Sequence, residues 1–287
     1  MTADLVVFFA HPVDGHQQVE RNGSRPAFAE VDDPVGQETV GGNVQQRGLN
    51  RVYWDLRNDA TKTPRMRTKP MNDAEFTMDA DGTRAAPGFG TLAVLMPPGR
   101  YTVKLTVDGP SFTQPLEVRK DPNEAASEPE IKATTDQLIA MQADINSTVD
   151  VLNTTEAVRA QIVTLQAQLL NDQKNADIRS QVDALEQKMI GLVQRIVDPR
   201  LTGRGQDEVR YPAKAGAQLN YLASGMAASD FTPTAQQREV GAVLDKQVKD
   251  NRATFDQLIA RDLAALNDLL KKRGLKPIEI TVPPVVF

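Results

Sequence analysis

The sequence has no cysteine, and only two histidines and one tryptophan occur among its 287 residues. The lack of cysteine excludes disulfides, thiolate metal sites and cysteine nucleophiles. His11 and His16 are the only imidazoles, so a serine triad would have to recruit one of them. The sequence also lacks a Gly-rich phosphate loop, a G-x-S-x-G elbow and an H-E-x-x-H motif. Few of the common catalytic arrangements are therefore open to this chain.

The chain also lacks an excess of positive charge and a long apolar run. Its net charge is -5 at pH 7, so Lys and Arg are not in surplus to replace counterions along phosphates, and we expect no nucleic-acid partner. The apolar run at residues 5–10 follows Asp4 instead of a basic region. It is too short for a signal peptide or a membrane span. We therefore expect no membrane partner and no export signal in this sequence.

The composition changes near residues 120–122. Before this point apolar residues come in short runs between Gly and Pro, and after it the sequence is rich in Ala, Gln, Leu and Asp with few helix breakers. We predict an α+β multidomain protein. Residues 1–122 would form an antiparallel β-sandwich of the immunoglobulin or fibronectin kind, residues 129–276 a bundle of long α-helices, and residues 277–287 a C-terminal tail that adds an edge strand.

The strand predictions rest on short apolar or alternating runs at residues 5–9, 52–54 and 92–96. The clearest pair is 101–107 and 111–118, in which the first run alternates apolar and polar residues and Asp108-Gly109 supplies a turn. Residues 58–90 contain Pro64, Pro70 and Pro87 and are predicted to be a long irregular excursion.

Helical periodicity is strong in the second part. Apolar residues from Ile131 to Leu169 predict one long helix, and those from Ile178 to Ile196 alternate spacings of four and three, which is typical of a helix seam. The polar turn at 171–175 predicts that these helices are antiparallel. A shorter helix around Leu219 follows, and a further long helix is predicted to start with Thr232 as its N-cap and to end at Gly274.

Three runs carry a family resemblance. Residues 48–57 have the pattern G-x-N-R-x-x-W-D-L-R, residues 96–103 contain P-G-x-Y-x-V, and residues 108–118 read DGPSFTQPLEV. The chain resembles the C-terminal region of large bacterial proteins known as glycosyl hydrolase, bacterial neuraminidase-repeat or sortilin-like proteins. In that family a β-propeller precedes a fibronectin type III-like sandwich and then helices.

The resemblance implies a non-catalytic accessory or interaction module that serves a β-propeller domain or another chain. It also implies a periplasmic or secreted location, although the sequence shows no signal peptide. The propeller itself is absent from the sequence, so the glycosidase chemistry associated with the family name does not extend to this chain. The seam at 178–196 could in addition form a homodimer through the long helices.

A second hypothesis is a metal-dependent hydrolase of small esters, lactones or glycosides. His11, Asp14 and His16 lie within six residues and have the ligand types of a zinc-like site that activates water. The alternative is a polar surface loop. Asp79 and Asp81 precede Gly82 as in the start of a calcium loop, although the Glu that an EF-hand requires is replaced by Gly90. These two carboxylates could bind Ca²⁺ or belong to a solvated loop.

Overall fold

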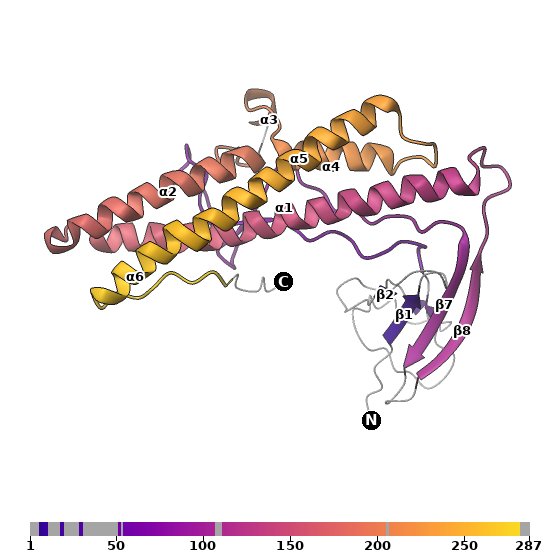
Figure 1. Cartoon of the computed structure of the whole chain (residues 1–287), viewed down its shortest axis with the longest axis horizontal. Helices are drawn as coiled ribbons and strands as arrows, with labels where there is room; N and C mark the ends of the chain where they lie inside the picture. The colour runs from indigo at the N-terminus through magenta and orange to yellow at the C-terminus, as the bar shows by residue number, and fades with distance from the viewer. Residues whose placement is uncertain are drawn as a thin grey trace. The chain divides into compact units, whose positions relative to one another are not determined.

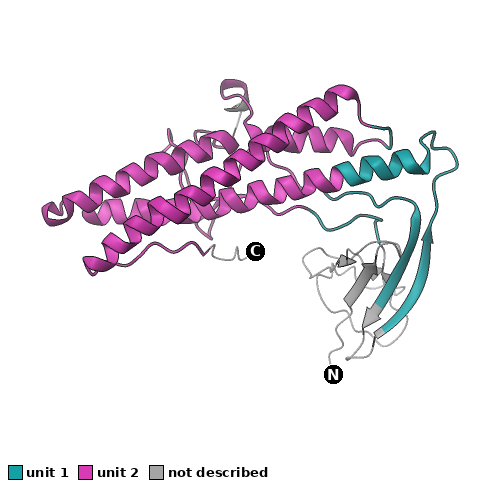
Figure 2. Ribbon diagram, in the orientation of Figure 1, with its two compact units in different colours: residues 1–60, 93–137, 230–232 teal, residues 61–92, 138–229, 233–287 magenta. Residues whose placement is uncertain are grey.

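The structure is a computed structural model that describes residues 6–10, 18–19, 29–30, 51–52, 54–106, 111–204 and 207–281. The chain divides into two compact units, which Figure 2 shows in different colours. The first unit comprises Met1–Ala60, Ala93–Gln137 and Asp230–Thr232. The second, which we call the helical unit, comprises Thr61–Leu92, Leu138–Ser229 and Pro233–Phe287. Residues 61–92, which we call the strap, thus belong to the same unit as the helices.

The strands of the first unit form a four-stranded antiparallel sheet in the order β2-β1-β7-β8. Its strands are β1 (Val6–Ala10), β2 (Gln18–Val19), β7 (Gly99–Thr106) and β8 (Ser111–Val118). β7 and β8 pair from Gly99 opposite Val118 to Thr106 opposite Ser111, which confirms the predicted hairpin. Pro115 lies within β8, and a proline is tolerated there because β8 is an edge strand. A two-residue pairing of β3 (Ala29–Glu30) with β4 (Arg51–Val52) belongs to the same unit.

The predicted N-terminal β-sandwich is wrong. The structure is mainly helical, and no β-sandwich is shown by the residues that it describes. A sandwich needs two sheets packed face to face, whereas the predicted strands at 52–54 and 92–96 yield only the short β4 and one isolated bridge between Arg57 and Leu95. Along β8, the side chains of residues 112–115 are all exposed, although successive residues point to opposite faces of the sheet. If a second sheet covered one face, every other one of these side chains would be buried.

The helical unit is built on helices (Figure 1). They are α1 (Glu128–Leu169), which begins in the first unit, α2 (Ala176–Ile196), α3 (Asp207–Arg210), α4 (Ala215–Met226), α5 (Ala235–Gln257) and α6 (Ala264–Lys272). Of these, α1, α2 and α5 are the long ones. A 3₁₀ turn, Gln173–Asn175, lies between the antiparallel α1 and α2. The predicted seam of α2 is confirmed, because its six members are all buried: Ile178, Val182, Leu185, Met189, Leu192 and Ile196.

The helix boundaries show two differences from the sequence-based prediction. The N-cap of α5 is Thr234, not Thr232. The Thr234 hydroxyl accepts from the Gln237 backbone N–H and the Gln237 side chain accepts from the Thr234 backbone N–H, a capping box. Secondly, a π-helical turn at Leu258–Leu263 joins α5 to α6. The signal for it is the five-residue step from Leu258 to Leu263, both buried, which a regular helix would place on different faces.

One apolar core holds the helical unit together. It joins side chains of α1, α2, the π turn and α6 with Met66 and Ala86 of the strap and Ile278 of the C-terminal tail. Met66 lies in β5 (Arg65–Met66), which pairs over two residues with β6 (Arg84–Ala85), and Ala86 directly follows β6. The irregular excursion predicted for residues 58–90 is therefore real, and most of it packs on helices. Among the described residues, no helix combines the length and apolar composition that crossing a bilayer requires.

Candidate functional site

One face of α1 carries polar side chains that hold the strap. They follow the helix at spacings of four, three and three and accept hydrogen bonds from the strap or pair with it. The donor and acceptor pairs are Lys62 N to Asn146 Oδ1 (2.8 Å), Lys62 Nζ to Asp150 (2.6 Å), Arg65 N to Asn153 Oδ1 (2.7 Å) and Arg67 N to Glu156 Oε2 (2.9 Å). Positions three and four apart lie on one helix face, so this row of acceptors runs along the strap.

Glu156 is the most buried member of this row, with no exposed surface. Its Oε2 accepts from three donors of the strap, which are the backbone N–H groups of Arg67 (2.9 Å) and Thr68 (3.0 Å) and the Thr68 hydroxyl (2.8 Å). Its Oε1 accepts from Arg159 Nη1 at 2.6 Å. Both oxygens of this carboxylate are therefore used inside the protein.

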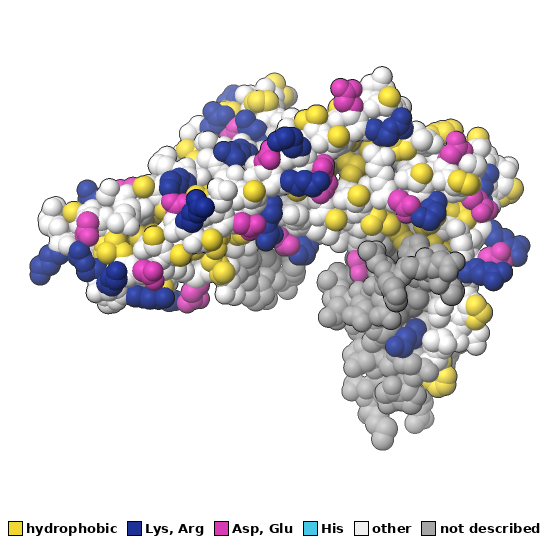
Figure 3. All heavy atoms as spheres, in the orientation of Figure 1, with side chains coloured by type: hydrophobic (Ala, Val, Ile, Leu, Met, Phe, Trp, Pro, Cys, Tyr) yellow, Lys and Arg dark blue, Asp and Glu magenta, His cyan; other side chains and the backbone are white. Residues whose placement is uncertain are grey.

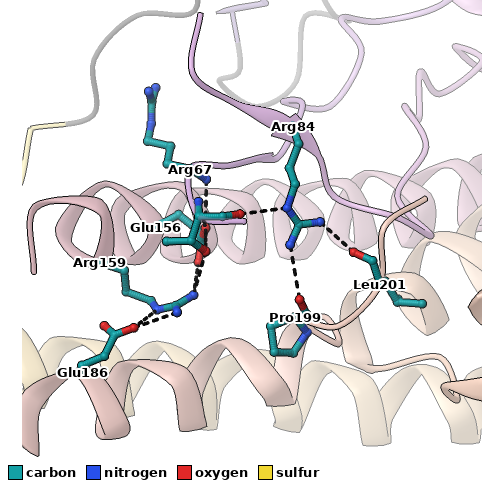
Figure 4. Close-up of polar contacts among 8 residues, drawn as sticks. Arg67, Arg84, Glu156, Arg159, Glu186, Pro199 and Leu201 are labelled. Carbon is teal, nitrogen blue, oxygen red and sulfur yellow. Dashed lines mark hydrogen bonds and ion pairs between the residues drawn. The ribbon is translucent and has the colours of Figure 1, made fainter. Parts of the chain in front are cut away.

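Arg159 connects the strap to α2. Its Nε and Nη2 donate to Glu186 Oε1 at 3.1 and 2.8 Å, and its Nη1 also donates to the Thr68 hydroxyl at 3.1 Å. Glu186 belongs to α2 and is 6% exposed. Figure 4 shows the guanidinium of Arg159 lying between the two carboxylates. The other oxygen of Glu186, Oε2, is buried without a hydrogen-bond partner.

A second buried guanidinium ties the strap to the loop after α2. Arg84 is 2% exposed, and its three nitrogens donate to three carbonyls. The acceptors are Thr68 O (2.9 Å), Leu201 O (2.8 Å) and Pro199 O (3.4 Å). Arg84 thereby donates to carbonyls that lie outside the helices and sheets, of which Pro199 O also accepts from Met71 N at 3.1 Å. With Glu156, Arg159 and Glu186 it forms what we call the buried charge cluster, whose two carboxylates balance its two guanidiniums.

Burial and neighbouring charges act against each other in this cluster. Burial raises the pKa of the Glu186 carboxyl, which Arg159 opposes and the charge of Glu156 reinforces. Burial also lowers the pKa of Arg84. Burial disfavours the charge of Arg159 as well, but Glu156 and Glu186 outweigh it and raise the pKa of that guanidinium. The arrangement can therefore fix the backbone of the strap and hold charge in the interior of the helical unit.

The predicted calcium ligands Asp79 and Asp81 lie in the strap and have internal partners. Asp79 Oδ2 accepts from Arg65 Nη1 at 3.1 Å. Asp81 Oδ1 accepts from the Thr83 hydroxyl at 2.8 Å and the Thr83 backbone N–H at 2.9 Å. These bonds from the Thr83 hydroxyl and backbone lower the pKa of Asp81. A cation would have to compete with Arg65 and Thr83 for these oxygens.

The predicted zinc-like ligands His11, Asp14 and His16 lie outside the described residues. Within the part of the chain that the structure describes, no group of three or more His, Cys, Asp or Glu side chains could hold a metal ion. Among these described residues, Asp79 and Asp81 therefore have no third acidic or histidine side chain beside them that would complete a metal site.

The buried charge cluster was missed by reasoning from the sequence. Between Thr148 and Arg159 most side chains of α1 are buried, including polar ones, because the apolar core covers one side and the strap the other. The available signal was Glu156 and Arg159 three residues apart beside Val158, within a stretch of mixed polarity. Such a pair on a helix usually indicates a solvated face.

The comparisons with known proteins add no relative. The sequence matches no protein-family model, and no curated protein and no solved structure was found to match it.

Proposed function

We propose that this chain is a non-catalytic interaction module that serves a β-propeller protein of the glycosyl hydrolase-like kind. The observation that carries the proposal is that both carboxylate oxygens of Glu156 accept hydrogen bonds from other groups of the protein. A catalytic carboxylate needs a lone pair or a proton for its substrate, but Glu156 spends both oxygens on the strap and on Arg159. The most deeply buried charges of the helical unit thus maintain a scaffold.

The first unit supports the same proposal, because two of the sequence runs that resemble the glycosyl hydrolase-like family contact each other there. Trp54 from the G-x-N-R-x-x-W-D-L-R run lies edge-on to Tyr101 from the P-G-x-Y-x-V run, with ring centroids 5.5 Å apart. Trp54 Nε1 donates to Arg57 O at 2.8 Å, and the Tyr101 hydroxyl donates to Pro97 O at 2.5 Å. Burial raises the pKa of Tyr101 to about 12, which keeps this hydroxyl protonated as a donor. The two runs therefore contact each other as parts of one local structure.

The surface of the helical unit suits a protein partner better than a polyanion. Lys and Arg are interspersed with Asp and Glu on the face shown in Figure 3. Several exposed pairs follow the helical spacing of four, among them Lys246 with Asp250 and Arg252 with Asp256. Mixed signs of this kind give no continuous positive track for phosphates.

The test is direct binding to a β-propeller. The full chain is mixed with the purified propeller of a protein that carries the same Trp-centred run, and the mixture is examined by size-exclusion chromatography with light scattering. At about 0.1 mM of each protein, any complex with a Kd below about 1 µM is saturated. We expect co-elution as one complex. Separate elution of the two proteins would refute the proposal.

The hydrolase hypothesis is tested on the same preparation. A panel of esters, lactones and glycosides is assayed with and without EDTA, and with the variants His11→Ala and Asp81→Ala. We expect no turnover that depends on metal. If turnover occurs and is abolished both by EDTA and by either variant, the metal site is the source of the activity. The chain would then be a metal-dependent hydrolase and not a non-catalytic interaction module.

A further inference from the structure

The C-terminal tail leaves α6 through a tight turn. Gly274 has φ +71°, a left-handed conformation that side chains rarely adopt. Its backbone N–H donates to Lys271 O at 3.1 Å and the N–H of Leu275 donates to Leu270 O at 2.9 Å, which is the bonding of a Schellman motif. The turn sends the tail back along the helices, as Figure 1 shows.

Two side-chain amides then hold the tail by its backbone. Asn267 of α6 binds both polar groups of Ile278, because its Oδ1 accepts from Ile278 N at 2.8 Å and its Nδ2 donates to Ile278 O at 2.9 Å. Gln161 of α1 does the same for Glu279, since its Oε1 accepts from Glu279 N at 2.9 Å and its Nε2 donates to Glu279 O at 2.8 Å.

This paired bonding is what a neighbouring β-strand would supply. In a hydrogen-bonded strand pair, one residue both donates its N–H and accepts through its C=O on the same side. Successive residues point these groups to opposite sides, so Asn267 and Gln161 hold the tail from α6 and from α1. Ile278 is 5% exposed and belongs to the apolar core, whereas Ile280 is 53% exposed. The site thus recognises backbone at two residues and one apolar side chain.

We infer that this site, which we call the amide clamp, also accepts the same tail from a second copy of the chain. The residues that fit the clamp are known, because the chain's own Ile278 and Glu279 occupy it. A second copy carries the identical segment, and exchange of an identical element needs no new complementarity. Only the turn at Gly274 decides between the two arrangements. If residue 274 continues the helix, the tail is carried away from its own Asn267 and fills the clamp of a two-fold partner.

The test changes that turn alone. No atom lies within 4 Å of a Cβ added at Gly274, so Gly274→Ala strains the backbone without a clash. Alanine disfavours the left-handed conformation and favours helix, while Asn tolerates the left-handed conformation and serves as the matched control. Relief of the strain favours the exchanged arrangement about five- to thirtyfold per chain. Because both chains of the dimer exchange their tails, we expect Gly274→Ala to raise the dimerisation constant, followed by light scattering over a concentration series, by the square of this factor, about 25- to 900-fold. Gly274→Asn should remain close to the wild type. Equal behaviour of the two variants overturns the inference.

The clamp is tested in the same background. Adding Asn267→Ala or Ile278→Ala to Gly274→Ala should restore the monomer, whereas Gln247→Ala, at an exposed amide of α5, should leave the dimer unchanged. A dimer that survives the loss of Asn267 forms through another surface and overturns the inference.

A second measurement keeps the inference testable if the Gly274→Ala chain does not fold. A labelled peptide of residues 275–281 is added to the full chain that carries Ile278→Ala, whose own tail is weakened in the clamp. We expect saturable binding by fluorescence anisotropy that is lost on adding Asn267→Ala. Absence of binding at millimolar chain concentration, or binding that does not depend on Asn267, refutes exchange.

Discussion

Replacing Glu156 by Gln should cost far more stability than the same replacement at Glu186, although both are buried carboxylates paired with Arg159. At Glu156, one side of the carboxylate faces N–H and O–H donors of the strap and the other faces Arg159 Nη1. A Gln amide has one acceptor oxygen and one NH₂ group. Whichever way it is turned, its NH₂ meets donors that then lack a partner.

The expected size follows from breaking a buried ion pair. Removing one partner of such a pair costs about 3–5 kcal/mol, and Glu156→Gln should fall in this range. Glu186→Gln keeps an oxygen facing Arg159 and places its NH₂ where Oε2 already lacks a partner. The two hydrogen bonds from Arg159 to this oxygen remain but no longer involve a charged acceptor. The loss is partly offset because a neutral amide is less costly to bury than a carboxylate. We therefore expect Glu186→Gln to lower the free energy of unfolding by about 1 kcal/mol.

The assay is urea unfolding followed by far-ultraviolet circular dichroism at neutral pH. Lys62→Ala is the matched control. Lys62 belongs to the strap, and its pair with Asp150, on the same face of α1 as Glu156, is about half exposed and should contribute less than about 1 kcal/mol. Unchanged m-values would show that stability alone has changed. A Glu186→Gln variant as unstable as Glu156→Gln would refute the reasoning from Gln geometry.

Three further predictions concern local packing, capping and pH. Gly216→Ala should destabilise the chain by about 1–3 kcal/mol in urea unfolding, because its Cβ would lie 2.0 Å from the Phe89 ring, while Gly225→Ala on the same helix has open space and should be neutral or stabilising. Equal effects of the two would contradict the packing argument. Thr234→Ala should cost about 1 kcal/mol in the same assay through loss of the N-cap, and an unchanged midpoint would contradict the capping box. Burial raises the pKa of Glu186 above its ordinary 4.5, so the folded chain binds this proton more tightly than the unfolded chain. Wild type should therefore gain stability relative to Glu186→Gln as the pH falls from neutral toward 4.5, and the opposite trend in urea midpoints would exclude the raised pKa.

The helices could be predicted because their signals are local. The seam of α2 repeats at fixed spacings, and Gly274 ends α6 as a left-handed C-cap residue commonly does. The β7–β8 hairpin was equally clear from its alternation and its turn. A sandwich, in contrast, was inferred from several short runs, and alternation in one hairpin does not say whether a second sheet covers it.

The candidate site could not be predicted because its partners are distant in the sequence and mostly backbone. Asn146, Asn153 and Glu156 have the spacing and polarity of a solvent-facing stripe. Their actual partners are backbone N–H groups of the strap, which carry no residue-type signal. The same holds for Asn267 and Gln161, whose amides bind backbone groups of the tail.

The attachment of the strap has a consequence for synthesis of the chain. Thr68 bonds to a residue of α1 that lies 88 positions later, and Arg84 bonds to Leu201, 117 positions later. A ribosome therefore releases the strap well before its acceptors exist, and contacts of such long sequence separation form slowly. Until the α1–α2 hairpin is complete, the strap N–H groups that bond to α1 have only water as a partner. Glu156 and Glu186 come together in that hairpin with Arg159 between them, so the receptor for the strap is complete only after α2 has emerged.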